Sequence, residues 1–270
     1  MSRPAGDEGA AWAVALFNRS VLKQEKYRRI TDLLEDPEGR SNLDIGADNG
    51  VISYLLRRRG GRWASADLDP RAVKSIRQLV GSDVHQLDGS RTPFPDAAFD
   101  QVVVVDYLEH IPDDAAFTDE LARILKPGGS VIINVPHLKP GSLVNRLRHR
   151  IGLTDEWHGH LRPGYREEDL RRLLGPRFEI ERAITYSGTF SELIDTLLNG
   201  VNELRRGRAR GTQASRKGTV VTAADLRGRR KEFRLLSAIY PVLWATARLD
   251  HLLVGQSGYK LILRARLRSR

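Results

Sequence analysis

The stretch NLDIGADNG at residues 42–50 constrains the fold most, because it joins a short apolar run to a helix through a glycine-bracketed turn. Residues 51–58 have the apolar spacing of one helical face. Gly46 and Gly50 can adopt backbone angles that other residues avoid, so a ligand can approach the main chain closely. The helix then starts with free N–H groups that face the loop. This pattern predicts a nucleotide-like ligand at the carboxyl end of a parallel strand.

Acidic residues follow the next strand-like segments along the chain. Asp67 ends the run RWASAD, where a carboxylate is placed to accept hydrogen bonds from ribose hydroxyls. Asp88 follows the run VHQL, and Asp106 follows FDQVVVV, which is apolar enough for a central parallel strand. Ligands of open α/β sheets bind at these strand ends, so the acids are candidate ligand contacts.

Five segments in this region occur in an order that resembles the class I S-adenosylmethionine (SAM)-dependent methyltransferases. They are LDIGADNG, ADLDP, LDGSRTPFPDAAFD, VVVVDYLEHI and ARILKPGG, within residues 40–136. The loop is G-x-x-x-G and lacks the dinucleotide fingerprint, which disfavours an NAD enzyme. One position departs from the family, which usually has Gly where this chain has Asp48.

The resemblance implies SAM as the cofactor and a Rossmann-like α/β fold. That fold is a doubly wound, mostly parallel seven-stranded sheet with an antiparallel last strand. It also implies that Asp88 meets the adenine amino group, that the Gly89 backbone N–H meets a ring nitrogen, and that Asp106 and Tyr107 lie beside the methionine portion. The predicted cofactor-binding residues are Asp44, Gly46, Ala47, Asp48, Asn49, Gly50, Asp67, Leu68, Asp88, Gly89, Asp106 and Tyr107.

The composition narrows the chemistry. The 270 residues contain no cysteine, which excludes a disulfide framework, a thiolate nucleophile and a cysteine-held iron–sulfur cluster. The N-terminus carries acids and no signal-type apolar core, and no run reaches the roughly 18 apolar residues of a membrane span. We therefore expect a cytoplasmic protein.

Three regions are expected. Residues 1–37 form an N-terminal helical segment, with one helix over residues 10–35. Residues 38–186 and 258–270 form the SAM-binding methyltransferase domain. Residues 187–257 form a helical, basic insertion between strands 6 and 7, and Pro241 should kink or divide its last helix.

The insertion holds most of the excess charge of the chain. The formal net charge is +10, and eleven Lys or Arg against three acids fall between Val201 and Arg234. One interpretation is a helical cap over the substrate pocket. A second, compatible interpretation is contact with an anionic membrane at its inner face, where a lipid-like substrate enters. The apolar helices are equally suited to a homodimer interface.

Four histidines are candidate catalytic residues: His110, His137, His158 and His160. An imidazole near neutral pKa can take a proton from an oxygen or nitrogen nucleophile. Glu109 and His110 are alternatively suited to capping the helix that follows. The H-x-H spacing of His158 and His160 binds a metal only if further ligands converge, so we predict no metal site.

These features predict a SAM-dependent methyltransferase that acts on a small-molecule or lipid-linked acceptor by in-line displacement. One alternative is an RNA methyltransferase, motivated by the basic segment. Nucleic acid is disfavoured as a partner, because the segment from Arg205 to Lys217 has no aromatic residue for base stacking. The other alternative is a protein with the SAM fold that binds a ligand without turnover.

Overall fold

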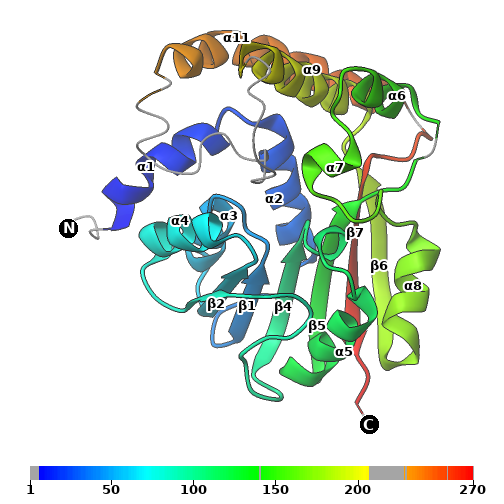
Figure 1. Ribbon diagram of the computed structural model, residues 1–270. Helices are drawn as coiled ribbons and strands as arrows, with labels where there is room; N and C mark the ends of the chain where they lie inside the picture. The colour runs from blue at the N-terminus through cyan, green and yellow to red at the C-terminus, as the bar shows by residue number, and fades with distance from the viewer. Residues whose placement is uncertain (1–5, 140, 207–227, 229, 254, 270) are drawn as a thin grey trace.

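A seven-stranded sheet in the order β3-β2-β1-β4-β5-β7-β6 forms the centre of the computed structural model, which describes residues 6–139, 141–206, 228, 230–253 and 255–269 (Figure 1). The strands are β1 (Ser41–Ile45), β2 (Arg62–Asp67), β3 (Val84–Gln86), β4 (Phe99–Val105), β5 (Leu125–Pro136), β6 (Phe178–Tyr186) and β7 (Lys260–Leu267). β7 runs antiparallel to β5 and β6, whereas the other neighbouring strands are parallel. The predicted fold class is confirmed.

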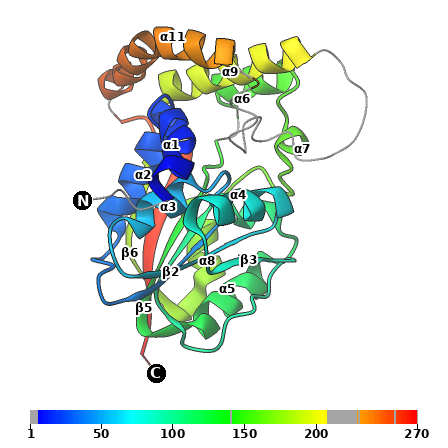
Figure 2. The same cartoon turned by 90° about the vertical axis from the view of Figure 1, so that its left-hand side faces the viewer.

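Helices cover both faces of the sheet (Figures 1 and 2). One face packs against α1 (Gly6–Phe17), α2 (Val21–Leu33), α3 (Val51–Arg57) and α4 (Pro70–Val80), and the other against α5 (Asp114–Ile124) and α8 (Glu167–Leu174). Successive residues of β4 alternate between the two cores: Val102 and Val104 face α5 and α8, while Val103 and Val105 face α1 to α3. A strand buried on both faces reads as a continuous apolar run, which is why β4 was predictable.

A third layer of helices lies beyond the carboxyl ends of the parallel strands (Figures 1 and 2). It contains α6 (Leu143–Arg150), α7 (Asp155–His158), α9 (Thr189–Arg206) and α11 (Arg230–Arg248). Among the described residues, short 3-10 turns occur at η1 (Leu108–His110), η2 (Gly175–Arg177) and η3 (Leu249–Leu252). α9 packs against both α6 and α11, and α2 reaches α9 and α11 from below. The predicted helical insertion between β6 and β7 is confirmed, although residues 207–227 of its basic stretch lie outside the described residues. Across the described ranges, none of the helices combines the length and apolar character needed to span a membrane.

The expectation of one N-terminal helix is wrong, and so is one of the two effects expected of Pro241. Residues 10–35 do not form one helix, because the chain breaks after α1 and restarts at the N-cap Ser20, whose Oγ accepts from the Lys23 N–H at 3.3 Å. Ser at an N-cap satisfies an N–H that the first helical turn leaves open, so the sequence carried a start signal there. Pro241 does not divide the last helix either. It lies at an exposed position inside the continuous helix α11.

The segment LKPGG, whose Pro and Gly residues are typical of a turn, belongs to β5. Leu125 pairs with Phe99, and the next pair along the ladder is Gln101 with Ser130, so the extra residues are accommodated as an irregularity. Gly128, with φ of 75°, supplies the backbone conformation that this irregularity needs.

Candidate active site

The loop after β1 has the close packing that only glycine permits. Gly46 has φ of 83°, and a Cβ there would lie 2.1 Å from the carbonyl oxygen of Val105. Gly50 has φ of 85° and is the N-cap of α3, where a Cβ would lie 2.8 Å from the Ile76 Cα. The loop therefore lies tight against β4 and α4, and its outer side remains open to a ligand.

Asp48, the residue that departs from the family pattern, faces outward from this loop. It has φ of 56°, and its half-exposed carboxylate accepts a hydrogen bond from Lys23 Nζ of α2 at 2.9 Å. Asp and Asn are the residues other than Gly that most readily take this left-handed conformation. The acid is therefore accommodated in the loop, and a cation from the N-terminal helix offsets its charge.

Asp67 lies at the carboxyl end of β2 with only 9% of its surface exposed. Its Oδ1 accepts the backbone N–H of Asp69 at 3.0 Å. Burial, helped by the nearby carboxylate of Asp48, raises the pKa of Asp67 to about 7 against the backbone hydrogen bonds that lower it. Asp69 itself caps α4 by accepting from the Arg71 N–H, a role typical of Asp before a Pro at the first helical position.

Asp106, at the end of β4, is held by three side chains from distant parts of the chain. Its carboxylate forms an ion pair with Lys26 of α2, accepts from Asn134 Nδ2 at 3.0 Å, and lies 3.8 Å from Lys260 Nζ. The residue has φ of 45°, an uncommon conformation that such contacts can maintain. Lys26 and Lys260 were not predicted, because neither follows a recognisable motif.

The next residue, Tyr107, is almost completely buried and donates from its hydroxyl to the Gly89 carbonyl oxygen at 2.6 Å. Burial, together with the carboxylates of Asp67 and Asp88, raises the pKa of Tyr107. The phenol therefore stays protonated as a donor, and it ties the end of β4 to the loop after β3.

These strand ends open onto one cavity of about 1250 Å³. Helices α2, α6, α7 and α9 supply its other walls. The predicted residues that line it are Gly46, Ala47, Asp48, Asn49, Asp67, Leu68, Asp106, Tyr107, His110, His137, His158 and His160. The structure therefore brings most of the predicted cofactor residues and all four candidate histidines to a single space.

Four predicted cofactor residues lie outside this lining. Asp44 is fully buried beneath the loop, where it accepts from Ser53 Oγ and, at 2.8 Å, from Ser65 Oγ. Burial raises the pKa of Asp44 against these two hydrogen bonds. Gly50 packs on α4, while Asp88 and Gly89 lie beyond Tyr107, with Asp88 on a smaller surface hollow.

Three of the four histidines form one group. The rings of His110 and His160 meet edge to face with centroids 5.0 Å apart, and His158 stacks on His160 at 5.3 Å. His137, after β5, is oriented by the Gly258 carbonyl oxygen, 2.8 Å from its Nδ1. Glu109, predicted only as an alternative helix cap, is fully buried behind the group.

A buried ion pair connects two helices of the third layer, α6 and α9. Arg148 of α6 binds the carboxylate of Glu192 in α9, which also accepts from Ser187 Oγ at 2.6 Å. Burial raises the pKa of Glu192, but the positive charges of Arg148 and Lys260 outweigh it and the net shift is downward. This pair could not be predicted, because its partners come from separate segments of the chain.

The sheet order, the glycine-bracketed loop after β1 and the acid at the end of β2 define a class: the Rossmann-like fold of class I SAM-dependent methyltransferases. A profile of the family described as a methyltransferase domain matches residues 43–133. Residues 43–133 are accordingly similar in sequence to a methyltransferase domain.

Similar proteins carry methyltransferase names. A ubiquinone biosynthesis O-methyltransferase from Xylella fastidiosa is 33% identical over 102 residues, which cover 36% of this chain and 42% of that protein. A demethylmenaquinone methyltransferase from Tropheryma whipplei is 29% identical over 134 residues, or 44% of this chain and 56% of that protein. The chain thus spans about half the length of the curated relatives it matches.

Solved structures extend the likeness to the whole fold. The structure of the [4+2]-cyclase SpnF has a TM-score of 0.58 and 19% sequence identity, over 92% of this chain and 82% of that one. At this identity the likeness concerns the fold.

Proposed function

We propose that the protein is a SAM-dependent methyltransferase whose acceptor is a small molecule or a lipid-linked molecule. The observation that carries the proposal is the single cavity shared by the loop after β1, the buried Asp67 and the candidate histidines. The site fits SAM in chemical terms. The loop after β1 packs tightly on β4 and α4 through Gly46 and Gly50, which leaves its outer side to the ligand, and a carboxylate stands where ribose hydroxyls are expected.

In this proposal, SAM supplies an activated methyl group, and the protein mainly positions the acceptor and excludes water. Asp67 would hold the ribose, Asp106 and Tyr107 the methionine portion, and the loop after β1 the centre of the cofactor. A histidine among His110, His137, His158 and His160 would take the proton of a hydroxyl acceptor. The relatives named for ubiquinone and demethylmenaquinone place quinone-type acceptors first in a substrate screen.

Calorimetric titration with SAM, S-adenosylhomocysteine and NAD tests the cofactor. We expect micromolar binding of the two SAM-type ligands by the wild type, no binding of NAD, and a loss of at least about tenfold in Asp67→Ala. Asp67→Asn keeps the shape and removes the charge, so it separates packing from hydrogen bonding. Binding of neither SAM-type ligand by folded wild type contradicts the proposal. That result would favour the alternative of a protein that has this fold but catalyses no methyl transfer. The structure of SpnF, named as a cyclase, illustrates that one fold serves different reactions.

The second proposal concerns the outer face of the insertion, which we propose rests on an anionic membrane. Exposed apolar side chains follow α9, α11 and η3: Leu197, Val201, Leu235, Ile239, Val242, Trp244, Leu249 and Leu252. Exposed cations lie among them, and the Arg248 guanidinium lies over the Trp244 ring at 3.6 Å. An amphipathic surface with cations beside apolar groups suits an anionic interface, and it would admit a lipid-linked acceptor.

Co-sedimentation with vesicles tests this surface. We expect binding to vesicles with anionic lipid at low salt, weaker binding to neutral vesicles, and loss of binding in Val242→Asp. Leu161→Asp is the matched control, because Leu161 is equally exposed but lies outside α9 and α11. If the protein without vesicles sediments as a dimer, and if Val242→Asp dissociates that dimer, the membrane proposal is contradicted. A salt-dependent RNA shift abolished by the same change would contradict it as well.

A further inference from the structure

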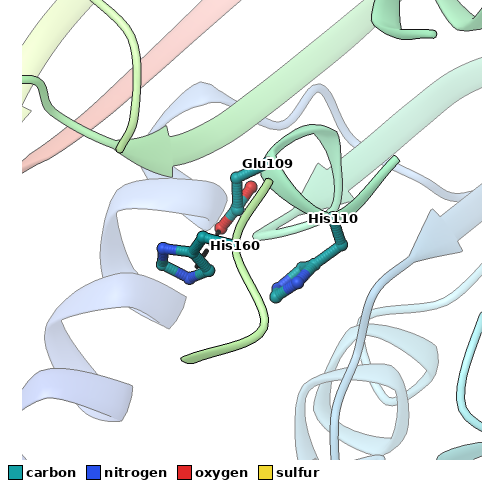
Figure 3. Close-up of side chains that lie close together, drawn as sticks. All are labelled: Glu109, His110 and His160. Atoms are coloured by element: carbon teal, nitrogen blue, oxygen red, sulfur yellow. Dashed lines mark ion pairs between the residues drawn. The ribbon is translucent and has the colours of Figure 1, made fainter. Parts of the chain in front are cut away.

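Glu109, His110 and His160 bring one carboxylate and two imidazoles together at the cavity wall (Figure 3). One candidate ligand atom from each residue lies within 4.8 Å of the other two. Glu109 and His110 belong to η1 after β4, whereas His160 comes from the segment after α7. We propose that these three residues bind a divalent transition-metal ion, a site that the H-x-H pair alone did not predict.

The backbone fixes the two segments against each other. The Leu161 N–H donates to the Glu109 carbonyl oxygen at 2.8 Å, and the His160 N–H donates to the Asp155 carbonyl oxygen at 2.9 Å. Gly159 closes α7 in the left-handed conformation, with φ of 72°, and turns the chain back toward η1. The side chains are therefore presented from a scaffold that does not depend on a metal ion.

Each histidine also has an oxygen near the ring nitrogen that faces away from a shared ion. His110 Nδ1 lies 2.8 Å from the Gly159 carbonyl oxygen and donates to it, so Nε2 carries the lone pair that a metal ion requires. His160 Nε2 lies 4.0 Å from Glu109 Oε1, and its Nδ1 lies 3.9 Å from Asp155 Oδ1. Metal-binding histidines generally donate from their second nitrogen to a carbonyl or carboxylate oxygen, as His110 does, whereas the His160 contact with Asp155 is longer than a hydrogen bond.

The electrostatics favour a cation at this point. Glu109 is completely buried and close enough to Lys260 to raise the pKa of that ammonium, so its carboxylate adds negative potential at this wall of the cavity. Ligand atoms about 2.1 Å from a tetrahedral ion are about 3.4 Å apart, so the 4.0 Å separation of Glu109 and His160 closes with a small ring movement. Two imidazoles and one carboxylate suit Zn²⁺, Co²⁺, Mn²⁺ or Fe²⁺ rather than Mg²⁺ or Ca²⁺.

The position of the site gives the ion a role that rests on the proposed methyltransferase function. His110 and His160 line the cavity, so an ion held by them would be accessible to an acceptor bound there. A metal ion would lower the pKa of a bound hydroxyl, so that His110 and His160 serve as ligands instead of as the base and the proton passes to solvent. The resulting oxyanion forms a bond to the methyl carbon as the carbon–sulfur bond breaks, and sulfur keeps the electron pair as a neutral thioether.

Titration of the tag-free, metal-stripped full-length protein with Zn²⁺, and separately with Co²⁺, tests the site directly. We expect one ion per chain, and a loss of roughly 10- to 100-fold in affinity in Glu109→Gln and His160→Gln. Both variants keep the side-chain volume approximately, and circular dichroism checks their folding. The visible d–d spectrum of bound Co²⁺ should change in His160→Gln, which a merely structural role would not produce.

His137→Gln is the matched control, since His137 lines the same cavity and has the same type of Nδ1 contact with a carbonyl oxygen. It should bind the ion as the wild type does. Absence of binding by the wild type overturns the proposal, as does binding that His137→Gln removes and His160→Gln leaves intact. SAM binding is measured in a separate titration of the metal-free protein. Failure of the metal site and failure of the proposed function can therefore be distinguished.

Discussion

Asp67 is the residue through which pH should act on stability. Its folded-state pKa of about 7 lies above its ordinary value of 3.8, because burial penalises the charge. Between these values the folded chain holds a proton that the unfolded chain releases, so the free energy of unfolding should fall as pH rises through this window. Asp67→Asn should flatten that decrease. Denaturant unfolding of both proteins across the window measures it, and equal pH slopes would contradict the assignment.

Binding of SAM should show the opposite pH dependence at the same residue. Only the ionised carboxylate can accept from both ribose hydroxyls, so affinity should fall about tenfold for each pH unit below about 7. Calorimetry on the wild type at several pH values gives the slope. Asp67→Asn should bind weakly at every pH. A wild-type affinity that does not change across neutrality would remove Asp67 from the ribose site.

Gly46 is a residue whose replacement should destabilise the loop strongly. Alanine there combines a left-handed backbone with a Cβ only 2.1 Å from the Val105 carbonyl oxygen, and should cost about 2–4 kcal/mol. Gly39 provides the comparison, since it also has positive φ but no atom within 4 Å of a new Cβ. Gly39→Ala should cost only about 1 kcal/mol. Chemical denaturation of both variants measures the two changes in the free energy of unfolding. Similar decreases would show that the backbone strain alone, and not the contact with Val105, destabilises the loop.

At the scale of elements, the ion pair of Arg148 and Glu192 joins α6 to α9 in a buried position. Removing one partner leaves the other charge buried, so Glu192→Ala should destabilise the fold by roughly 3 kcal/mol. The exposed pair of Glu167 and Arg171 within α8 is the control, and Glu167→Ala should change stability by less than about 1 kcal/mol. Equal effects in equilibrium unfolding would mean that the pair of α6 and α9 is solvated in solution.

The elements that could be predicted from the sequence are those whose signals are local. The loop after β1, the apolar run of β4 and the Asp69 cap of α4 each depend on residues close together in the chain. The cations on Asp106 could not be predicted, because Lys26 and Lys260 reach it from opposite ends of the sequence. The same holds for His160, which meets Glu109 only once the segment after α7 folds back onto η1.

At the scale of the whole molecule, the sheet supplies one half of the site and the helical layer the other. The carboxyl ends of β1, β2 and β4 form the cavity floor, while α2, α6, α7 and α9 form its walls. Ion pairs from Lys23 to Asp48 and from Lys26 to Asp106 connect the two halves across the opening. A ligand bound in the cavity should therefore stabilise both halves together.

Hydrogen exchange measured by mass spectrometry can test this coupling. Saturating S-adenosylhomocysteine should slow amide exchange in residues 46–50 and in α2, whose lysines Lys23 and Lys26 contact the loop after β1 and the end of β4. α8 serves as the internal reference, because it packs on the other face of the sheet and should exchange as before. Protection confined to residues 46–50 would show that α2 moves independently of the cofactor. Protection spread equally to α8 would indicate global stabilisation rather than closure of the site.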